Sequence, residues 1–447
     1  MAMTLAEHLA PEPGPKRILA LDGGGVKGIL TLGMLEPLEA ELRRRSGDPK
    51  LVLSDYYDLI GGTSTGAIIA SGLALGMSVA ELIEMYSDLG PQVFHRRRSS
   101  GLLFRSQYDH TALVRALEPV MGQVLLGDRE RIKTGLSIHM KRIDTGSAWT
   151  VSNSPNNPYF DPPDHSDTIP NAHYPLIDLV RASAAAPTFF DEVTINTEWD
   201  ENRVPTTPGY FVDGAVSANN NPSLQLLMTA LTPEYGFAWK AGADALMMTS
   251  LGTGLRRPRA KRDGGVQLAG VKAIAALRAM IYDTQVQAVK LMQTVSDPKI
   301  AWRIDSEIQD MRGVQYAGPN AGKQVRARPF SGVALLDYQR MDVDLSLRPA
   351  ALKRPSRKAP ETPPQEEAEI VYEGGFLGIG RRRMRPSSVE TLLGRKLSAK
   401  TILRLDELAN GDPANMALLL EIGRTAGARY VSAAYPDPRF NFPGWSA

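Results

Sequence analysis

The chain has 447 residues, of which 43% are hydrophobic and 22% are charged, and its formal net charge is +2. Such a chain can bury a sizeable core, and its near-neutral charge gives no general reason to expect a DNA or RNA target. The absence of cysteine excludes disulfides, thiolate catalysis and cysteine-ligated metals. The N-terminus lacks a signal-peptide pattern, and the nearly apolar stretch 66–77 is too short to span a bilayer, so we expect a cytoplasmic protein.

The first elements follow a repeated order of strand, glycines and helix. Residues 1–16 are rich in proline and are predicted to be a flexible leader. An apolar run at 17–21 ends in three glycines and precedes a helical pattern, and the same order recurs at 56–75. This repetition favours an α/β fold with a mainly parallel sheet. Further strands are predicted at 135–143, 209–214 and 244–254, and a long helix over 266–295.

The C-terminal third divides into two parts. Residues 349–386 are rich in proline, glycine and basic residues and are predicted to be a linker or an exposed insertion. Residues 387–447 have helix-like patterns, and we expect them to pack on the main domain, residues 17–348.

The stretch GTSTG at 62–66 matches the Gly-x-Ser-x-Gly pattern of a nucleophilic serine. Gly62 and Gly66 allow a tight turn between a strand and a helix, which would expose the hydroxyl of Ser64. A glycine-lined turn capped by serine is an equally open interpretation of the motif taken alone.

A nucleophilic serine needs a base, and histidine is badly placed for that role. The six histidines all lie at or before residue 173, so the late acidic residues have no histidine after them. A carboxylate acting directly on Ser64 fits better, and Asp213 is the preferred candidate. It follows a strand-like run and precedes Gly214, so we expect it at the carboxyl edge of the sheet, where ligands gather. An Asp-Gly turn is the structural alternative.

The glycine run GGGVKG at 23–28 fits the dinucleotide pattern Gly-x-Gly-x-x-Gly. That pattern also requires an acidic residue at the end of the next strand, whereas Asp58 lies before the end of that strand. A serine hydrolase instead needs backbone N–H groups directed at an oxyanion, and consecutive glycines before a helix can supply them. We therefore prefer an oxyanion hole.

Taken together, DGGGVKG (22–28), GTSTG (62–66) and DGA (213–215), in this order, resemble the patatin-like phospholipase family. Three further stretches are similar to the family or its bacterial members: RASAAAPTFF (181–190), NNP (220–222) and YQRMDVDLS (338–346). The resemblance implies a three-layer α/β/α fold with a mainly parallel central sheet and a helical C-terminal extension.

The resemblance also implies the roles of the motif residues. Ser64 would attack an acyl ester and Asp213 would accept its proton, as a dyad. The amides of Gly23, Gly24 and Gly25 would hold the oxyanion. Five residues would support the motifs, and among them Lys27 has no assigned partner: Lys27, Gly28, Gly62, Gly66 and Gly214.

The implied substrate is phospholipid, met at the inner membrane surface by a peripheral protein, with no metal or organic cofactor. The chain also looks like bacterial patatins that cyclic nucleotides activate in antiphage defence. A homo-oligomeric assembly is a further open alternative. The alternative function is a nucleotide-binding regulatory module that uses Gly23–Gly28 and has no hydrolase activity.

Overall fold

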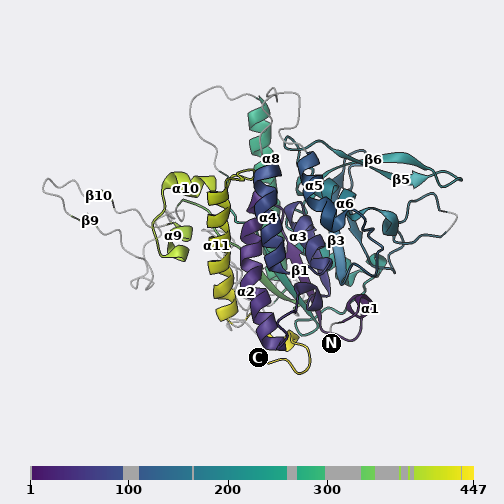
Figure 1. Ribbon diagram of the computed structural model, residues 1–447, viewed down its shortest axis with the longest axis horizontal. Coiled ribbons are helices and arrows are strands. Elements are labelled where there is room, and N and C mark those ends of the chain that lie inside the picture. The colour runs from purple at the N-terminus through teal and green to yellow at the C-terminus, as the bar shows by residue number, and fades with distance from the viewer. Residues whose placement is uncertain are drawn as a thin grey trace, which may run out of the picture.

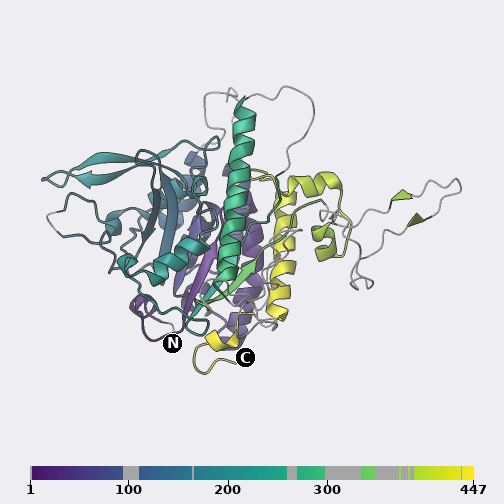
Figure 2. The ribbon, with the colours of Figure 1, turned by 180° about the vertical axis from the view of Figure 1, so that it is seen from behind.

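The computed structural model describes residues 3–93, 110–163, 166–258, 269–296, 334–347, 372–373, 381–382, 387–433 and 435–446. In this part of the chain an eight-stranded sheet lies between two layers of helices (Figures 1 and 2). The α/β fold with a mainly parallel sheet is therefore confirmed.

The strand order is β5-β6-β3-β2-β1-β7-β8, and β4 pairs with β3 outside this path. Five strands run parallel to one another: β1 (Lys16–Leu21), β2 (Leu59–Thr63), β3 (Gly135–Arg142), β7 (Leu246–Leu251) and β8 (Asp337–Met341). The antiparallel part consists of β4 (Ala148–Ser152), β5 (Val193–Trp199) and β6 (Pro205–Asp213). The strand predicted at 209–214 is thus the end of an antiparallel hairpin.

Both faces of the sheet are buried. Along β1, Leu19 and Leu21 belong to one hydrophobic core, whereas Ile18 and Ala20 belong to the other. The alternation follows from the two-residue period of a strand. On the first face lie α2 (Gly28–Ser46), α3 (Thr65–Ala74), α4 (Val79–Val93), α5 (His110–Met121) and α6 (Leu176–Ser183) (Figure 1). On the second lie α7 (Ser223–Leu231) and α8 (Ala269–Thr294) (Figure 2).

The N-terminal segment differs from the flexible leader that the sequence suggests. Helix α1 (Leu5–Leu9) begins with a capping box between Thr4 and Glu7, and His8 is fully buried. The His8 Nδ1 atom lies 2.9 Å from Asp58 Oδ1, and the Lys16 ammonium donates to the His8 carbonyl at 3.2 Å. The buried carboxylate of Asp58 thus fixes a segment whose composition alone indicates disorder.

The C-terminal part of the chain forms three helices, α9 (Ser388–Leu393), α10 (Ala399–Arg404) and α11 (Pro413–Ser432). Helix α11 lies directly on α2 (Figure 1). A Cβ atom on Gly33 would lie 2.6 Å from the Leu420 carbonyl oxygen, and one on Gly423 would lie 2.2 Å from that of Leu30. Only glycine permits this close approach of two helix backbones.

Most of the segment 349–386 lies outside the described residues. Its described part is a pair of short strands, β9 (Tyr372–Glu373) and β10 (Arg381–Arg382), which pair antiparallel. Among all the helices that the structure describes, none has the length and hydrophobicity needed to cross a bilayer.

Candidate active site

Ser64 occupies a strained turn between β2 and α3. Its φ of 56° and ψ of −122° lie in a region that residues with a side chain seldom adopt, as at many functional sites. A Cβ atom on Gly62 would lie 2.1 Å from the Gly66 carbonyl oxygen, and one on Gly66 would lie 2.2 Å from that of Leu21. The two glycines therefore let the turn close tightly against the end of β1.

Asp213 reaches Ser64 along an antiparallel strand. In the sheet register, Thr63 of β2 lies opposite His139 of β3, and Asp213 of β6 lies opposite the next residue, Met140. Ser64 and Asp213 therefore flank β3 at the same level. Strand β6 runs antiparallel to β3, so it enters from beyond the carboxyl edge of the parallel strands and ends there at Asp213.

The Asp213 carboxylate is buried, with 2% of the residue exposed. It accepts a hydrogen bond of 2.8 Å from the amide of Ala215. Burial raises the pKa of Asp213 to about 6, and the nearby Ser64 side chain and the Ala215 amide oppose the shift. A carboxylate with this pKa is ionised at neutral pH and still basic enough to accept a proton.

The glycine loop passes over the serine. A Cβ atom on Gly23 would lie 3.2 Å from the Cβ atom of Ser64. The Gly23 amide donates to the Asn220 carbonyl at 3.0 Å, and the Val26 amide donates to the Leu408 carbonyl at 2.9 Å. The structure gives the amides of Gly24 and Gly25 no acceptor among the described residues. This corrects the expectation for Gly23, whose N–H group is already engaged.

Three other segments hold the glycine loop. Besides Asn220, the Thr253 hydroxyl donates to the Gly23 carbonyl at 3.1 Å. Gly25 has a φ of +59°, and a Cβ atom there would lie 2.3 Å from the Leu408 carbonyl oxygen. The C-terminal segment before α11 thus lies against the loop, and a side chain at Gly25 would meet both backbone strain and a steric clash.

Lys27, which the sequence left without a partner, is buried beneath this loop. Its ammonium donates to the Gly254 carbonyl at 3.0 Å and lies 3.3 Å from a carboxylate oxygen of Asp406. Lys27 therefore connects the glycine loop to the segment after β7 and to the C-terminal helices. Gly28 has a close neighbour too, because a Cβ atom there would lie 2.3 Å from the Thr65 hydroxyl. A Cβ atom on Gly214 would lie 2.5 Å from the His139 carbonyl oxygen.

Sequence reasoning did not find Ser183, the last residue of α6. The Ser64 amide donates to the Ser183 hydroxyl at 2.9 Å, and this hydroxyl donates to the His139 carbonyl at 2.6 Å. Two residues further on, the Ala185 carbonyl accepts the Asp213 amide at 3.0 Å. One short segment thus fixes the backbone of both candidate catalytic residues. The stretch RASAAAPTFF was the available signal, but it did not indicate which atom would act.

Two observations bear on other kinds of site. Among the described residues no group of three or more His, Cys, Asp or Glu side chains could hold a metal ion.

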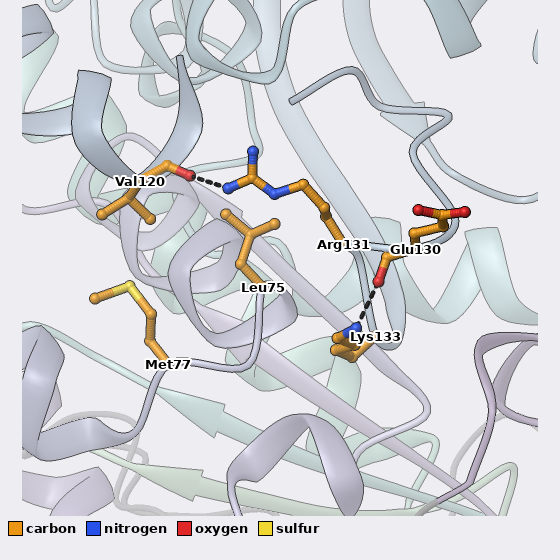
Figure 3. A pocket seen from close by; sticks show the side chains of 6 residues that line it. All are labelled: Leu75, Met77, Val120, Glu130, Arg131 and Lys133. Carbon is orange, nitrogen blue, oxygen red and sulfur yellow. Dashed lines mark hydrogen bonds between the residues drawn. The ribbon is translucent and has the colours of Figure 1, made fainter. Parts of the chain in front are cut away.

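A pocket lined by six residues lies at the C-terminal end of α3, far from Ser64. Its Arg131 and Lys133 side chains donate to backbone carbonyls (Figure 3). The lining residues are Leu75, Met77, Val120, Glu130, Arg131 and Lys133.

The geometry also bears on the dinucleotide interpretation. Strand β2 ends at Thr63 and leads directly into Ser64, so no acidic side chain follows it. Asp58 lies at the opposite end of β2, where it bonds to the Arg17 backbone and side chain. The carboxyl end of β2 therefore lacks the acidic residue that a dinucleotide site uses to bind the ribose.

The fold and the site together define an α/β protein with a serine on a strand–helix turn, a buried carboxylate and a glycine loop. Residues 19–227 match the family model described as patatin-like phospholipase, so this part of the chain is similar to that family. The matched region includes the glycine loop, Ser64 and Asp213.

The curated relatives include plant and bacterial proteins. Patatin-T5 of Solanum tuberosum is 28% identical over 254 residues, which are 53% of this chain and 60% of the relative. A cGAMP-activated phospholipase of Escherichia coli (strain TW11681) is 30% identical over 216 residues, which are 47% of this chain and 55% of the relative. The chain thus spans little more than half the length of these proteins.

Two solved structures are similar at low scores. VipD from Legionella pneumophila aligns at 13% identity and a TM-score of 0.29, covering 77% of this chain and 64% of that one. Human GIVD cytosolic phospholipase A2 aligns at 10% identity and a TM-score of 0.42, covering 96% and 61%.

Proposed function

We propose that this protein is a lipid acyl hydrolase that cleaves acyl esters of phospholipids with a Ser64–Asp213 dyad. The observation that carries the proposal is the Ser64 side chain near the buried Asp213 carboxylate, whose pKa it lowers, with the glycine loop packed against Ser64. The family that residues 19–227 match supports the same class of reaction.

In this reaction the Ser64 oxygen attacks the ester carbonyl carbon, and its proton passes to Asp213. The amides of Gly24 and Gly25 donate to the oxyanion of the tetrahedral intermediate. Asp213 returns the proton to the departing alcohol, which leaves an acyl-enzyme. Water then attacks the acyl group with Asp213 again as base, and the fatty acid is released as Ser64 regains its proton.

We extend the proposal to where and when the protein acts. A phospholipid substrate requires contact with a membrane surface, and we place the protein in the cytoplasm, peripheral to the inner membrane. The bacterial relative is named as activated by cGAMP, which supports a cyclic nucleotide as the activator and a role in antiphage defence. The catalytic residues themselves carry no information on the activator.

The test is fatty-acid release from vesicles of defined phospholipids, with and without a panel of cyclic oligonucleotides. We expect Ser64→Ala to lower the rate at least about 10³-fold, because both chemical steps pass through this oxygen. A fluorophosphonate should label the parent and not this variant. Unchanged lipid hydrolysis by Ser64→Ala would overturn the proposal, and release without any nucleotide would overturn its activation part.

A further inference from the structure

Arg340, in β8 at the edge of the sheet, makes a buried ion cluster below the glycine loop. Its two terminal nitrogens donate to the two carboxylate oxygens of Asp22 at 2.9 and 2.6 Å. The second nitrogen also donates to Asp342 at 2.7 Å, and the first to the Ser250 hydroxyl at 2.8 Å. Asp22 and Arg340 are both nearly inaccessible to solvent, and Asp22 immediately precedes Gly23.

The second carboxylate of the cluster continues toward the same loop. One oxygen of Asp342 accepts the amide of Gly254 at 2.9 Å, and the Gly254 carbonyl accepts the Lys27 ammonium. Gly252 packs against Asp342, since a Cβ atom there would lie 2.1 Å from the carboxylate. Arg340 therefore acts on the loop from both ends, through Asp22 before the glycines and through Asp342 and Lys27 after them.

This cluster costs free energy to bury, because one arginine and two carboxylates leave water together. Burial raises the pKa of Asp22 to about 6, and Arg340 opposes that rise. An apolar contact at this place would stabilise the sheet edge without desolvating charged groups. It would not fix the orientation of Asp22. The planar guanidinium, with two parallel N–H groups on one carboxylate, fixes both the distance and the orientation of Asp22.

We propose that Arg340 and Asp342 are positioning residues, which hold the glycine loop so that the amides of Gly24 and Gly25 point at the oxyanion. The inference rests on the proposed acyl hydrolase function for its kinetic consequence. It rests for its geometry only on the contacts of Asp22, Arg340 and the segment 252–254. It also gives a role to the stretch YQRMDVDLS, which the proposed reaction leaves without one.

The kinetic consequence is a loss of rate in the chemical steps. The oxyanion forms only on the way to the tetrahedral intermediate, so displaced amides lower kcat while ground-state binding is preserved. A displacement of about 1 Å at a reacting group costs about 10²-fold. We therefore expect Arg340→Met to lower kcat about 10²-fold with KM changed less than about threefold. Arg340→Lys keeps the charge and loses the paired contact with Asp22. Its kcat should therefore lie between that of the parent and that of Arg340→Met.

A matched control is available at the other end of β1. Arg17 is also buried, donates to Asp58 at 3.1 Å, and lies at the start of the strand that ends before Asp22. Arg17→Met breaks a comparable arginine–aspartate contact far from the loop. Both variants should lose stability, and the comparison is made at a temperature where circular dichroism shows each to be folded.

Amide hydrogen exchange of a peptide spanning residues 22–28 measures the loop without any substrate. Faster exchange in Arg340→Met but not in Arg17→Met, together with the selective loss of kcat, is the expected result. Equal kcat or equal exchange in the two variants would overturn the positioning role. If the parent releases no fatty acid, the proposed function has failed, and the exchange comparison still decides the inference.

Discussion

The two ends of the central sheet both contain a buried aspartate, in opposite surroundings. At the amino end, Asp58 contacts Arg17 at 3.1 Å, His8 at 2.9 Å and Lys16 at 3.9 Å. At the carboxyl end, Asp213 accepts a hydrogen bond from the backbone amide of Ala215 and lies near the Ser64 side chain. The first carboxylate ties α1, β1 and β2 together, whereas the second forms no ion pair within the part of the chain that the structure describes.

The difference teaches how one sheet separates stability from reactivity. The buried Asp58 carboxylate among cations adds fixed contacts between segments of the chain. A buried carboxylate without a cation destabilises the fold when it is ionised, and the same energy makes it a base. The strained backbone of Ser64 lies at this second end as well, which is consistent with a site built at the expense of stability.

The largest expected effect is at Asp213. Asp213→Asn should lower the rate of lipid hydrolysis about 10³-fold or more, because the amide cannot accept the serine proton. The same variant should be more stable at pH 7 by up to about 3 kcal/mol, the equivalent of a pKa raised from 3.8 to about 6. Urea unfolding and fatty-acid release measure the two quantities on one preparation.

The sign of that stability difference depends on pH. Because the folded-state pKa is raised, Asp213 is fully favourable to folding only below about pH 4, and its contribution falls as the pH rises to about 6. The gain in Asp213→Asn should therefore vanish near pH 4. A variant that is less stable than the parent at both pH values contradicts the contrast between the two ends.

At the amino end, Asp58→Asn should give the reverse pattern. Removing one partner of a buried ion cluster leaves Arg17 and Lys16 without their counter-charge, at a cost of about 3–5 kcal/mol in the free energy of unfolding. Because the cluster lies at the far end of the strands, kcat of the folded protein should change less than about twofold. A large loss of kcat with normal stability would show that the two ends are not independent.

The pH dependence of the reaction comes next in size. Asp213 must be ionised to accept a proton, so kcat/KM should rise about tenfold per pH unit below pH 6 and level off above it. Asp22 has a pKa of about 6 as well, and its protonation would weaken the contact with Arg340. A slope approaching two indicates that both groups must be ionised, whereas a flat profile between pH 5 and pH 8 contradicts the role of Asp213.

The smallest of these effects is expected at Ser183. Ser183→Ala removes the acceptor for the Ser64 amide, so the strained turn loses one fixed contact. We expect kcat to fall about tenfold. This corresponds to a rise of about 1.4 kcal/mol in the activation free energy, which is the size of one hydrogen bond. Ser183→Thr keeps the hydroxyl and should restore most of the rate. Equal rates in the alanine and threonine variants would mean that the hydroxyl has no positioning role.

The sequence predicted the features that depend on local patterns. Glycines beside an apolar run gave the two strand–helix turns and Ser64, since such turns need small residues at fixed places. Asp213 was proposed from its neighbours in the sequence, which do not indicate the direction of its strand. The direction of β6 depends on its pairing with β3 and β5. The residues GYFVDG do not indicate with which strands they pair.

Long-range partners were not predictable for the same reason. Arg340 bonds to Asp22 across 318 positions of the chain, and Lys27 reaches Asp406 across 379. The pattern of a single sequence does not indicate which of such distant residues will contact each other. His8 was missed because a proline-rich composition indicates disorder only on average, and one buried carboxylate was enough to order the segment around it.

The contact between the glycine loop and Leu408 also has a consequence for the order of events during synthesis. Residues 23–27 leave the ribosome before Asp406 and Leu408, because Asp406 lies 379 positions after Lys27 in the chain. Until then the loop lacks the carbonyl that holds Val26 and the carboxylate that faces Lys27. The glycine loop therefore reaches its final geometry only after the segment around residues 406–408 has been synthesised and has packed against it.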